Sequence, residues 1–116
     1  MLAKENRLKK KNDFARVMAS GGMAGGPWLV LRFVKNQLEV SRAGFVCSKK
    51  TAKRAVDRNR IKRQLRESMR RVWLEMATGY DLVLIVRTPL MGQPFDEIQA
   101  ALEKLLKKAR LLKNNN

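Results

Sequence analysis

The chain has 116 residues, 45% of them hydrophobic, which suffices for one domain over residues 1–116 that folds without covalent or metal cross-links. Its 26 lysines and arginines against 10 acidic residues give a formal charge of +16, which indicates a polyanionic partner. A single cysteine and no histidine exclude a disulfide framework and a structural zinc site, so Cys47 is expected to be a small buried residue in a reducing cytosol.

The N-terminal segment is strongly basic. Residues 1–11 carry five cations against Glu5 alone, which predicts a flexible basic arm with too little apolar content to pack. This segment lacks the apolar run of a signal peptide, and no stretch approaches the ~20 apolar residues of a membrane span. We therefore expect a soluble cytoplasmic protein without membrane contact. At the other end, residues 113–116 are expected to fray.

A short helix is predicted after the arm. Phe14, Val17 and Met18 lie at helical spacing, and Asn12 or Asp13 offers an N-cap in front of them. A pair of glycines ends this pattern, and the glycine-rich stretch that follows could hold a short strand.

Three further strands are predicted. Residues 28–34 are rich in β-forming side chains. Residues 40–48 follow a polar turn and are expected to pair antiparallel with them. Residues 80–87 form the most apolar run and predict a buried strand. In the first of these strands, one face would carry Trp28, Val30, Arg32 and Val34.

Two longer helices complete the pattern. The first spans about 52 to 76 between the last two strands, which makes a β-α-β unit. Its inward face would carry Ile61, Leu65, Met69, Val72, Trp73 and Met76. The second follows Pro94 and buries Ile98, Leu102, Leu105, Leu106, Ala109 and Leu112.

The outward face of the central helix is densely cationic. Between residues 49 and 71 there are 11 cations against Asp57 and Glu67, too many for pairing within the helix. A solvated surface is the ordinary interpretation of such a run. The uniform sign, the preference for arginine and a neutral asparagine among the cations favour phosphate binding instead. This charged face consists of Asn59, Arg60, Arg63, Arg66 and Arg70.

RNA is the favoured nucleic acid. A helix that reads the DNA major groove usually carries several short polar side chains, whereas this one offers arginine, lysine and Asn59. RNA-binding proteins rely on backbone, shape and unstacked bases, so we expect an RNA partner and no DNA.

The stretch S-K-K-T-A-K-R-A-V-D-R-N-R-I-K-R-Q-L-R-E resembles the signature of the bacterial ribonuclease P protein subunit. The matching residues are Ser48, Lys49, Lys50, Ala55, Val56, Arg58, Asn59, Lys62, Arg63, Arg66 and Glu67. The resemblance extends through R-L-K-K-K-N-D-F and D-L-V-L-I-V-R, and covers roughly residues 7–110.

The resemblance implies an α+β fold. The family has a two-layer α/β sandwich with the order α-β-β-β-α-β-α and a four-stranded sheet, similar to the second domain of a small-subunit ribosomal protein. It places the additional strand near Met23 and Ala24 and implies a left-handed β-α-β crossover, against the usual right-handed rule. This chain departs from the family at Ala52, where glycine is usual, and at Arg32, where an aromatic residue can occur.

The resemblance also implies a function. The chain has no histidine and its carboxylates are scattered, a poor set for a protein nuclease. In the family, the RNA subunit carries the active site with Mg²⁺, and the protein assists removal of the 5′ leader from precursor tRNA without holding the metal itself. We therefore expect the accessory subunit of a ribonucleoprotein endoribonuclease, with no catalytic residue of its own. Two alternatives remain: a ribosomal or generic RNA-binding or chaperone module, and a stand-alone nuclease.

Two groups of site residues follow from the resemblance. The group expected to bind the catalytic RNA is Lys49, Lys50, Lys53, Arg58, Asn59, Arg60, Lys62, Arg63, Arg66 and Arg70. The group expected to line a cleft for the single-stranded leader is Phe14, Met18, Val30 and Arg32. Phe14 could stack on a base or simply pack in the core with Val17.

Overall fold

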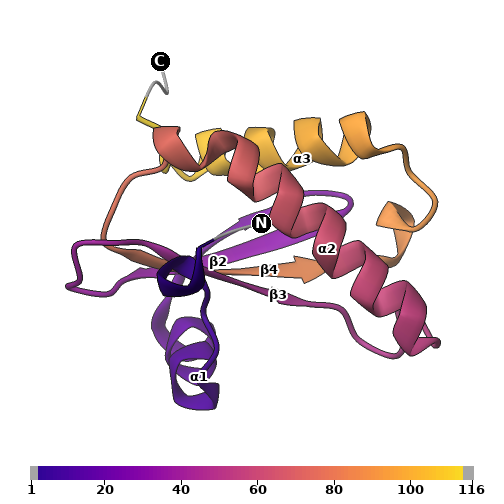
Figure 1. The fold of residues 1–116 in the computed structure, drawn as a ribbon, viewed down its shortest axis with the longest axis horizontal. Helices are drawn as coiled ribbons and strands as arrows, with labels where there is room; N and C mark the ends of the chain where they lie inside the picture. Colours follow the sequence, from indigo (N-terminus) through magenta and orange to yellow (C-terminus); the bar gives the residue numbers. More distant parts are fainter. Residues whose placement is uncertain (1–2, 114–116) are drawn as a thin grey trace.

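The protein is a four-stranded sheet with helices on both faces (Figure 1). The computed structural model describes residues 3–113. Its helices are α1 (Lys11–Ser20), α2 (Ala55–Val72) and α3 (Phe95–Lys108), with short 3₁₀ turns at Lys4–Asn6, Trp73–Glu75 and Thr88–Leu90. Its strands are β1 (Gly22–Gly25), β2 (Leu29–Lys35), β3 (Arg42–Val46) and β4 (Tyr80–Val86). This confirms the α-β-β-β-α-β-α order and the short strand in the glycine-rich stretch.

The strand order is β1-β2-β4-β3, so the expected pairing of β2 with β3 is wrong. Instead β2 pairs antiparallel with β1 and β4, and β3 pairs parallel with β4. The reason lies in β4, where Leu82, Val83 and Leu84 are buried on both faces. A strand that is apolar on both faces belongs in the centre of a sheet, where it needs a neighbour on each side.

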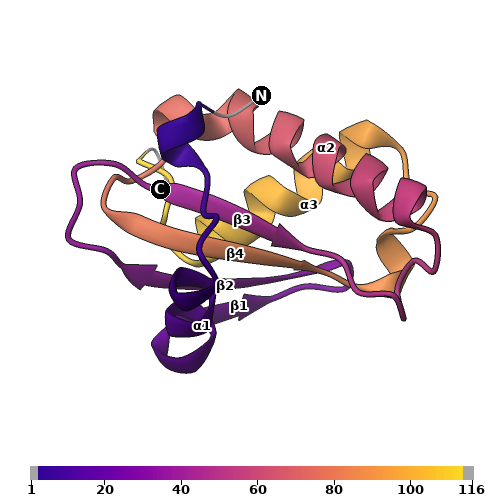
Figure 2. The ribbon, with the colours of Figure 1, turned by 60° about the horizontal axis from the view of Figure 1, so that its bottom comes forward.

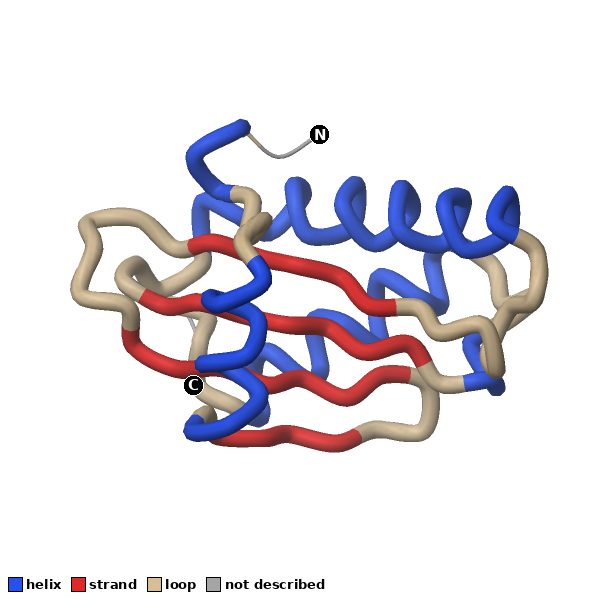
Figure 3. The backbone as a smooth tube through the Cα atoms, turned by 90° about the horizontal axis from the view of Figure 1, so that it is seen from below, coloured by secondary structure: helices blue, strands red, loops and turns tan. Residues whose placement is uncertain are grey.

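The connection from β3 through α2 to β4 is left-handed. In Figure 2 the arrows of β3 and β4 both point to the right and β3 lies above β4, and Figure 3, seen from below, has the helices α2 and α3 behind the sheet. A helix behind the sheet with this direction of movement gives the opposite hand to the usual crossover. The implication drawn from the resemblance is therefore confirmed.

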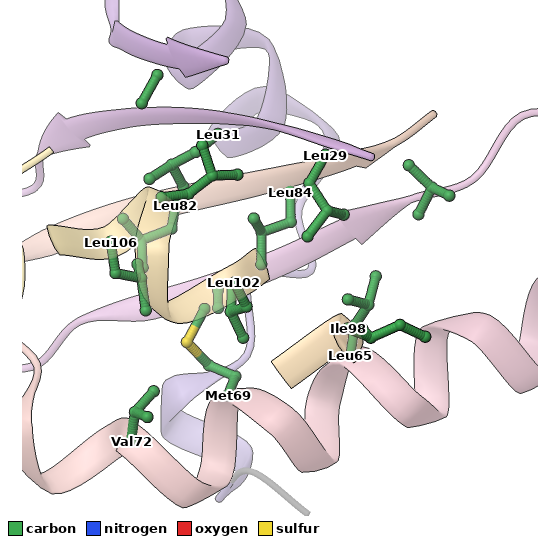
Figure 4. Close-up of a cluster of buried hydrophobic side chains, with 14 of the residues drawn as sticks. Leu29, Leu31, Leu65, Met69, Val72, Leu82, Leu84, Ile98, Leu102 and Leu106 are labelled. Carbon is green, nitrogen blue, oxygen red and sulfur yellow. The ribbon is translucent and has the colours of Figure 1, made fainter. Parts of the chain in front are cut away.

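The main core lies between the sheet and the pair α2 and α3 (Figure 4). Leu65 and Met69 of α2 and Leu102 of α3 are fully buried there, because apolar residues recur on one face of each helix. They pack on the face of the sheet that carries Leu31 and Leu84. No helix among residues 3–113 is long and apolar enough to cross a membrane.

The opposite face of the sheet is only partly covered. Helix α1 crosses this face, as Figures 2 and 3 show, and forms a second small core in which Val17 and Val83 are fully buried. Leu8 is buried in the same cluster, and its N–H donates to the carbonyl of Ala43 at 2.9 Å. Residues 3–11 are therefore not an unpacked arm, because one apolar side chain and one backbone bond fix them; residues 1–2 lie outside the described part.

Several predicted boundaries also shift. Helix α1 begins after Lys10 as its N-cap, so neither Asn12 nor Asp13 caps it. Helix α2 begins at Ala55 instead of about residue 52, because the preceding residues form a turn closed by the carbonyl of Ser48. At the far end, Trp73–Glu75 tightens into a 3₁₀ turn, although Met76 stays buried.

Trp28 and Leu112 lie outside the elements predicted for them. Strand β2 begins at Leu29, and Trp28 packs against the main core on the α3 side instead of sharing a face with Val30. Leu112 is buried beyond the end of α3 and forms an isolated bridge with Met76. Fraying is expected for residues 113–116, but the N–H of Lys113 donates to the carbonyl of Glu75 at 2.6 Å; residues 114–116 lie outside the described residues.

Candidate nucleic-acid interface

Helix α2 presents its two faces as the sequence predicts. Ile61, Leu65 and Met69 are buried against the sheet and α3. Asn59, Arg60, Arg63 and Arg70 are exposed on the other side, while Arg66 and Lys62 are half-buried. An arginine-rich surface of this kind matches phosphate oxygens, because a guanidinium donates two parallel N–H bonds.

Arg58 is tied to the loop in front of α2. Its Nη1 donates to the carbonyls of Ala52 and Lys53 at 2.9 and 2.8 Å. These bonds link the helix to the segment that carries the lysines of the signature. Arg58 therefore positions the loop, and any contact with RNA must use its remaining donors.

The loop from β3 to α2 holds three exposed lysines: Lys49, Lys50 and Lys53. It turns tightly, since the N–H groups of Thr51 and Ala52 donate to the carbonyl of Ser48 at 3.1 and 3.0 Å. Ala52 is buried, and it is not among the non-glycine residues with positive φ in the described chain, which are Gln37 and Arg110. Alanine therefore fits at this position without backbone strain.

One acidic side chain partly neutralises the charged face. Glu67 accepts two hydrogen bonds from Arg70, at 3.0 Å from Nε and 2.6 Å from Nη2. The hydrogen bond from Arg70 is the main cause that lowers the pKa of Glu67 from its ordinary value. Arg66 and Arg70 lie four residues apart on α2, so this ion pair reduces the repulsion between their charges. Arg66 differs from its neighbours, because its Nε is buried without a hydrogen-bond partner among the described residues.

Cys47 lies where the loop begins and is buried, as expected. Burial raises the pKa of its thiol, although the nearby charges of Lys62 and Arg58 act in the opposite direction. The side chain therefore packs as a small apolar residue beside the charged helix.

The sheet face beside α1, where the leader is expected, carries a partly exposed apolar strip. Residues paired across all four strands form this strip, which we call the open row: Gly25, Val30, Ile85 and Val46. Val46 is 36% exposed, and Val30 and Ile85 are only half-buried although both lie in inner strands. Met18 and Met23, 42% and 64% exposed, lie on the same side of the sheet. The strip offers apolar surface to an unstacked base.

Met18 and Arg32 come together at the edge of the open row. Nη2 of Arg32 donates to the carbonyl of Met18 at 2.6 Å, and its Nη1 lies 3.9 Å from the sulfur of Met23. Arg32 thus connects the C-terminal half of α1 to β2. Arg32 and Val30 lie on the same face of β2, and their contact with the leader stays a prediction.

Phe14 is instead a core residue. It packs with Leu8 and Val17, and its ring lies over Gly44 so closely that a Cβ added there would be 2.4 Å from Cζ of the ring. Of the two interpretations of Phe14, packing is the one that the structure supports. Only a glycine at position 44 permits this approach of the ring to β3.

Sequence reasoning missed Ile85 and Val46 as parts of this surface. Their strands were predicted, but the strand order was needed to place them beside Val30.

Sequence reasoning also missed Asp81, a lone carboxylate at the start of the most apolar strand. An ionisable residue in a predicted buried strand is a detectable signal, because such a group must find partners.

Asp81 is fully buried at the centre of a polar network of five side chains. Its Oδ1 accepts from Asn36 and from Nε of Arg42, both at 2.9 Å. Its Oδ2 accepts from Nη2 of Arg42 at 2.7 Å and from Nη2 of Arg16. Asp13 completes this Asp81 network through Nη1 of Arg42 at 3.4 Å. Burial alone would raise the pKa of Asp81, but the hydrogen bonds from Arg42 and Asn36 and the two arginine charges hold it below its ordinary value.

Candidate metal ligands are dispersed over the part of the chain that the structure describes. Within residues 3–113, no three His, Cys, Asp or Glu side chains come together as candidate metal ligands. Asp81 is fully occupied by its arginine and asparagine donors. What the surface supplies is oriented cations on one side of the sheet and open apolar surface on the other.

Comparison with known proteins identifies the family. The family model for ribonuclease P matches residues 2–110. The ribonuclease P protein component of Dehalococcoides mccartyi is 42% identical over 111 residues, which cover 96% of this chain and 90% of the relative. A Staphylococcus aureus RNase P protein mutant with defective mRNA degradation activity has a similar structure, with a TM-score of 0.87 and 31% identity over 94% of this chain and 92% of its own. The RNase P protein from Thermotoga maritima matches with a TM-score of 0.81 and 32% identity, over 88% of this chain and 96% of its own. The chain therefore belongs to the ribonuclease P protein family.

Proposed function

We propose that this chain is the protein subunit of ribonuclease P in the cytoplasm and assists the removal of the 5′ leader from precursor tRNA. Family membership supports this role in tRNA processing. One observation supports the proposal most strongly. The cationic face of α2 and the apolar open row lie on opposite sides of one sheet, and the loop between β3 and α2 carries three exposed lysines.

The two surfaces suit two different RNA segments. The charged face of α2, with the loop lysines, would bind phosphates of the catalytic RNA. The open row would hold the single-stranded leader, with Met18, Val30 and Arg32 beside it, because apolar surface favours unstacked bases. One protein could then bring the leader and the catalytic RNA together.

In this proposal, the RNA subunit performs the cleavage. The Mg²⁺ ions would be held mainly by that RNA, and the cations of α2 would ease their binding by lowering the repulsion between nearby phosphates. The protein contributes binding and orientation, and none of its side chains touches the reacting phosphate.

Reconstitution tests this division of roles. Cleavage of precursor tRNA should be measured at low Mg²⁺ with the catalytic RNA alone, the protein alone, and both together. We expect activity only in the mixture, and RNA alone should recover activity as Mg²⁺ is raised. Cleavage by RNA-free protein would contradict the proposal, and equal activity with an unrelated basic protein would indicate a generic RNA-binding module instead.

A further inference from the structure

Helix α1 borders the open row, but polar contacts away from that row hold it in place. Two ion pairs connect α1 to the sheet: Arg16 with Asp81 of β4, and Asp13 with Arg42 of β3. Arg16 also donates from Nη1 to the carbonyl of Lys35 at 3.3 Å. These contacts lie on the side of α1 that faces away from the open row, since Asp81 pairs with Val34 and Arg42 at the other end of the strands.

The Asp81 network is rigid at its centre. Asp81 is 0% exposed and accepts four hydrogen bonds from three side chains, so its carboxylate has a single orientation. Because a buried carboxylate needs its cationic partners, Arg16 is drawn to one position. The ion pair of Arg16 with Asp81 therefore fixes one point of α1 on the sheet. The hydrogen bond from Arg32 to the carbonyl of Met18 fixes a second point.

The apolar contacts of α1 alone are small. Of its side chains, Val17 is fully buried and Phe14 is half-buried, whereas Met18 is 42% exposed. Such a short helix is not stable by itself, so its position depends on tertiary contacts. A shift of α1 toward Val30 and Ile85 would cover the open row.

We propose that Arg16 and Asp81 are positioning residues for leader binding: their ion pair holds α1 at the distance that leaves the open row accessible, although neither residue lines that row. This inference rests on the proposed function of the open row. Binding of the catalytic RNA would be unaffected, because α2 lies on the opposite face of the sheet (Figure 1).

Direct contact of Arg16 with RNA is the competing explanation. Arg16 lines an open surface pocket with Lys10, Lys35, Asp13 and Arg42, where a phosphate could bind. A lost phosphate contact reduces the salt dependence of binding by about one counterion, whereas a displaced helix does not. Salt dependence therefore separates positioning from direct contact.

The test uses the holoenzyme reconstituted with the catalytic RNA. Dissociation constants are measured for precursor tRNA with its leader and for leader-free tRNA, at several salt concentrations, with the wild type, Arg16→Met and Arg16→Lys. Arg110→Met is the control, because it removes the same charge at an exposed position next to α3. Hydrogen exchange of the α1 amides in the same complexes reports the position of the helix directly.

We expect Arg16→Met to reduce the affinity gained from the leader by about tenfold, the size of one lost base contact. The affinity for leader-free tRNA should stay unchanged, and so should the slope of log affinity against log salt concentration. The amides of α1 should exchange faster. Arg16→Lys should recover most of the leader affinity, since an ammonium can still pair with Asp81.

Three outcomes would overturn the inference. Unchanged leader affinity and α1 exchange in Arg16→Met would show that the pair does not position the helix. If Arg16→Met reduced the slope of log affinity against log salt concentration by about one, Arg16 would be assigned to direct contact with a phosphate. If the wild type itself gained nothing from the leader, the proposed function of the open row would fail, and the inference with it.

Discussion

At the scale of single residues, Asp81 connects the sequence to the stability of the fold. The chain places one carboxylate in its most apolar strand and surrounds it with Arg16, Arg42 and Asn36. Removing a buried charge from such a network leaves its partners uncompensated. Asp81→Asn should therefore lower the free energy of unfolding by about 3–5 kcal/mol, as measured by urea unfolding at neutral pH.

The pH dependence of Asp81 has a definite sign. Its folded pKa lies below the unfolded value of about 3.9, so its stabilisation is present above that pH and is lost as the pH falls through the folded pKa. The unfolding free energy of the wild type should decrease below about pH 4 more steeply than that of Asp81→Asn. If the free energy of unfolding fell equally steeply with pH in the two proteins between about pH 4 and 2, the pKa of Asp81 would be unshifted.

Gly44 has a steric role that the sequence does not reveal. Because a Cβ there would overlap the ring of Phe14, Gly44→Ala should destabilise the protein by about 1–3 kcal/mol. Replacing the ring in Phe14→Leu should make the alanine tolerable, so the double variant should show a coupling of at least about 0.5 kcal/mol. Thermal unfolding of the four proteins measures this cycle, and additive effects would exclude the overlap.

At the scale of elements, α2 separates stability from binding on its two faces. Leu65 is fully buried, so Leu65→Ala should cost about 2–5 kcal/mol of unfolding free energy. Arg63 is exposed, and Arg63→Ala should change stability by no more than about 0.5 kcal/mol while weakening binding to the catalytic RNA. Arg63 is a better test than Arg66, whose side chain is half-buried.

Thermal melts without RNA and titrations with the catalytic RNA at one salt concentration distinguish the faces of α2. Leu65→Ala, while still folded, should bind nearly as the wild type does. A destabilised Arg63→Ala that binds RNA normally would mean that the charged face is structural.

At the scale of the whole molecule, the net charge of +16 should make RNA binding strongly salt-dependent. By analogy with duplex DNA, six to ten phosphate contacts would lose about 10³–10⁵ in affinity between about 50 and 200 mM salt. Titration of the catalytic RNA over this range measures the slope. A flat profile would contradict an electrostatic interface.

The sequence predicts which segments form helices and strands better than it predicts which of these elements lie side by side. Helical and strand periodicity locate α2, α3, β2, β3 and β4 because the pattern records which face is buried. It does not record which strands pair, so the position of β4 between β2 and β3 was missed. The glycine-rich stretch indicated that a short fourth strand was possible, but its place near Met23 and Ala24 and the handedness of the crossover came only from the family resemblance.

The same distinction applies to the candidate site, where the sequence predicts the charged face but not the open row. The charged face lies on one helix, so its outward position follows from spacing alone. The open row needs four strands in the right order, and the packing of Phe14 and Leu8 depends on Gly44 and Ala43 across the sheet. Contacts between residues distant in sequence are the part that local patterns cannot supply.

This division of binding, with α2 on the catalytic RNA and the open row on the leader, is the basis of the proposed function. Site-directed RNA cleavage tests it most directly, with an iron chelate attached to one thiol at a time in a Cys47→Ala background. Asn59→Cys places the chelate on the charged face, Val46→Cys on the open row, and Arg110→Cys next to α3 as a control. We expect cuts in the catalytic RNA from Asn59→Cys, cuts in the leader of bound precursor tRNA from Val46→Cys, and weak cutting of either RNA from Arg110→Cys. Cuts from Val46→Cys that fall only in the catalytic RNA, or none from Asn59→Cys, would contradict it.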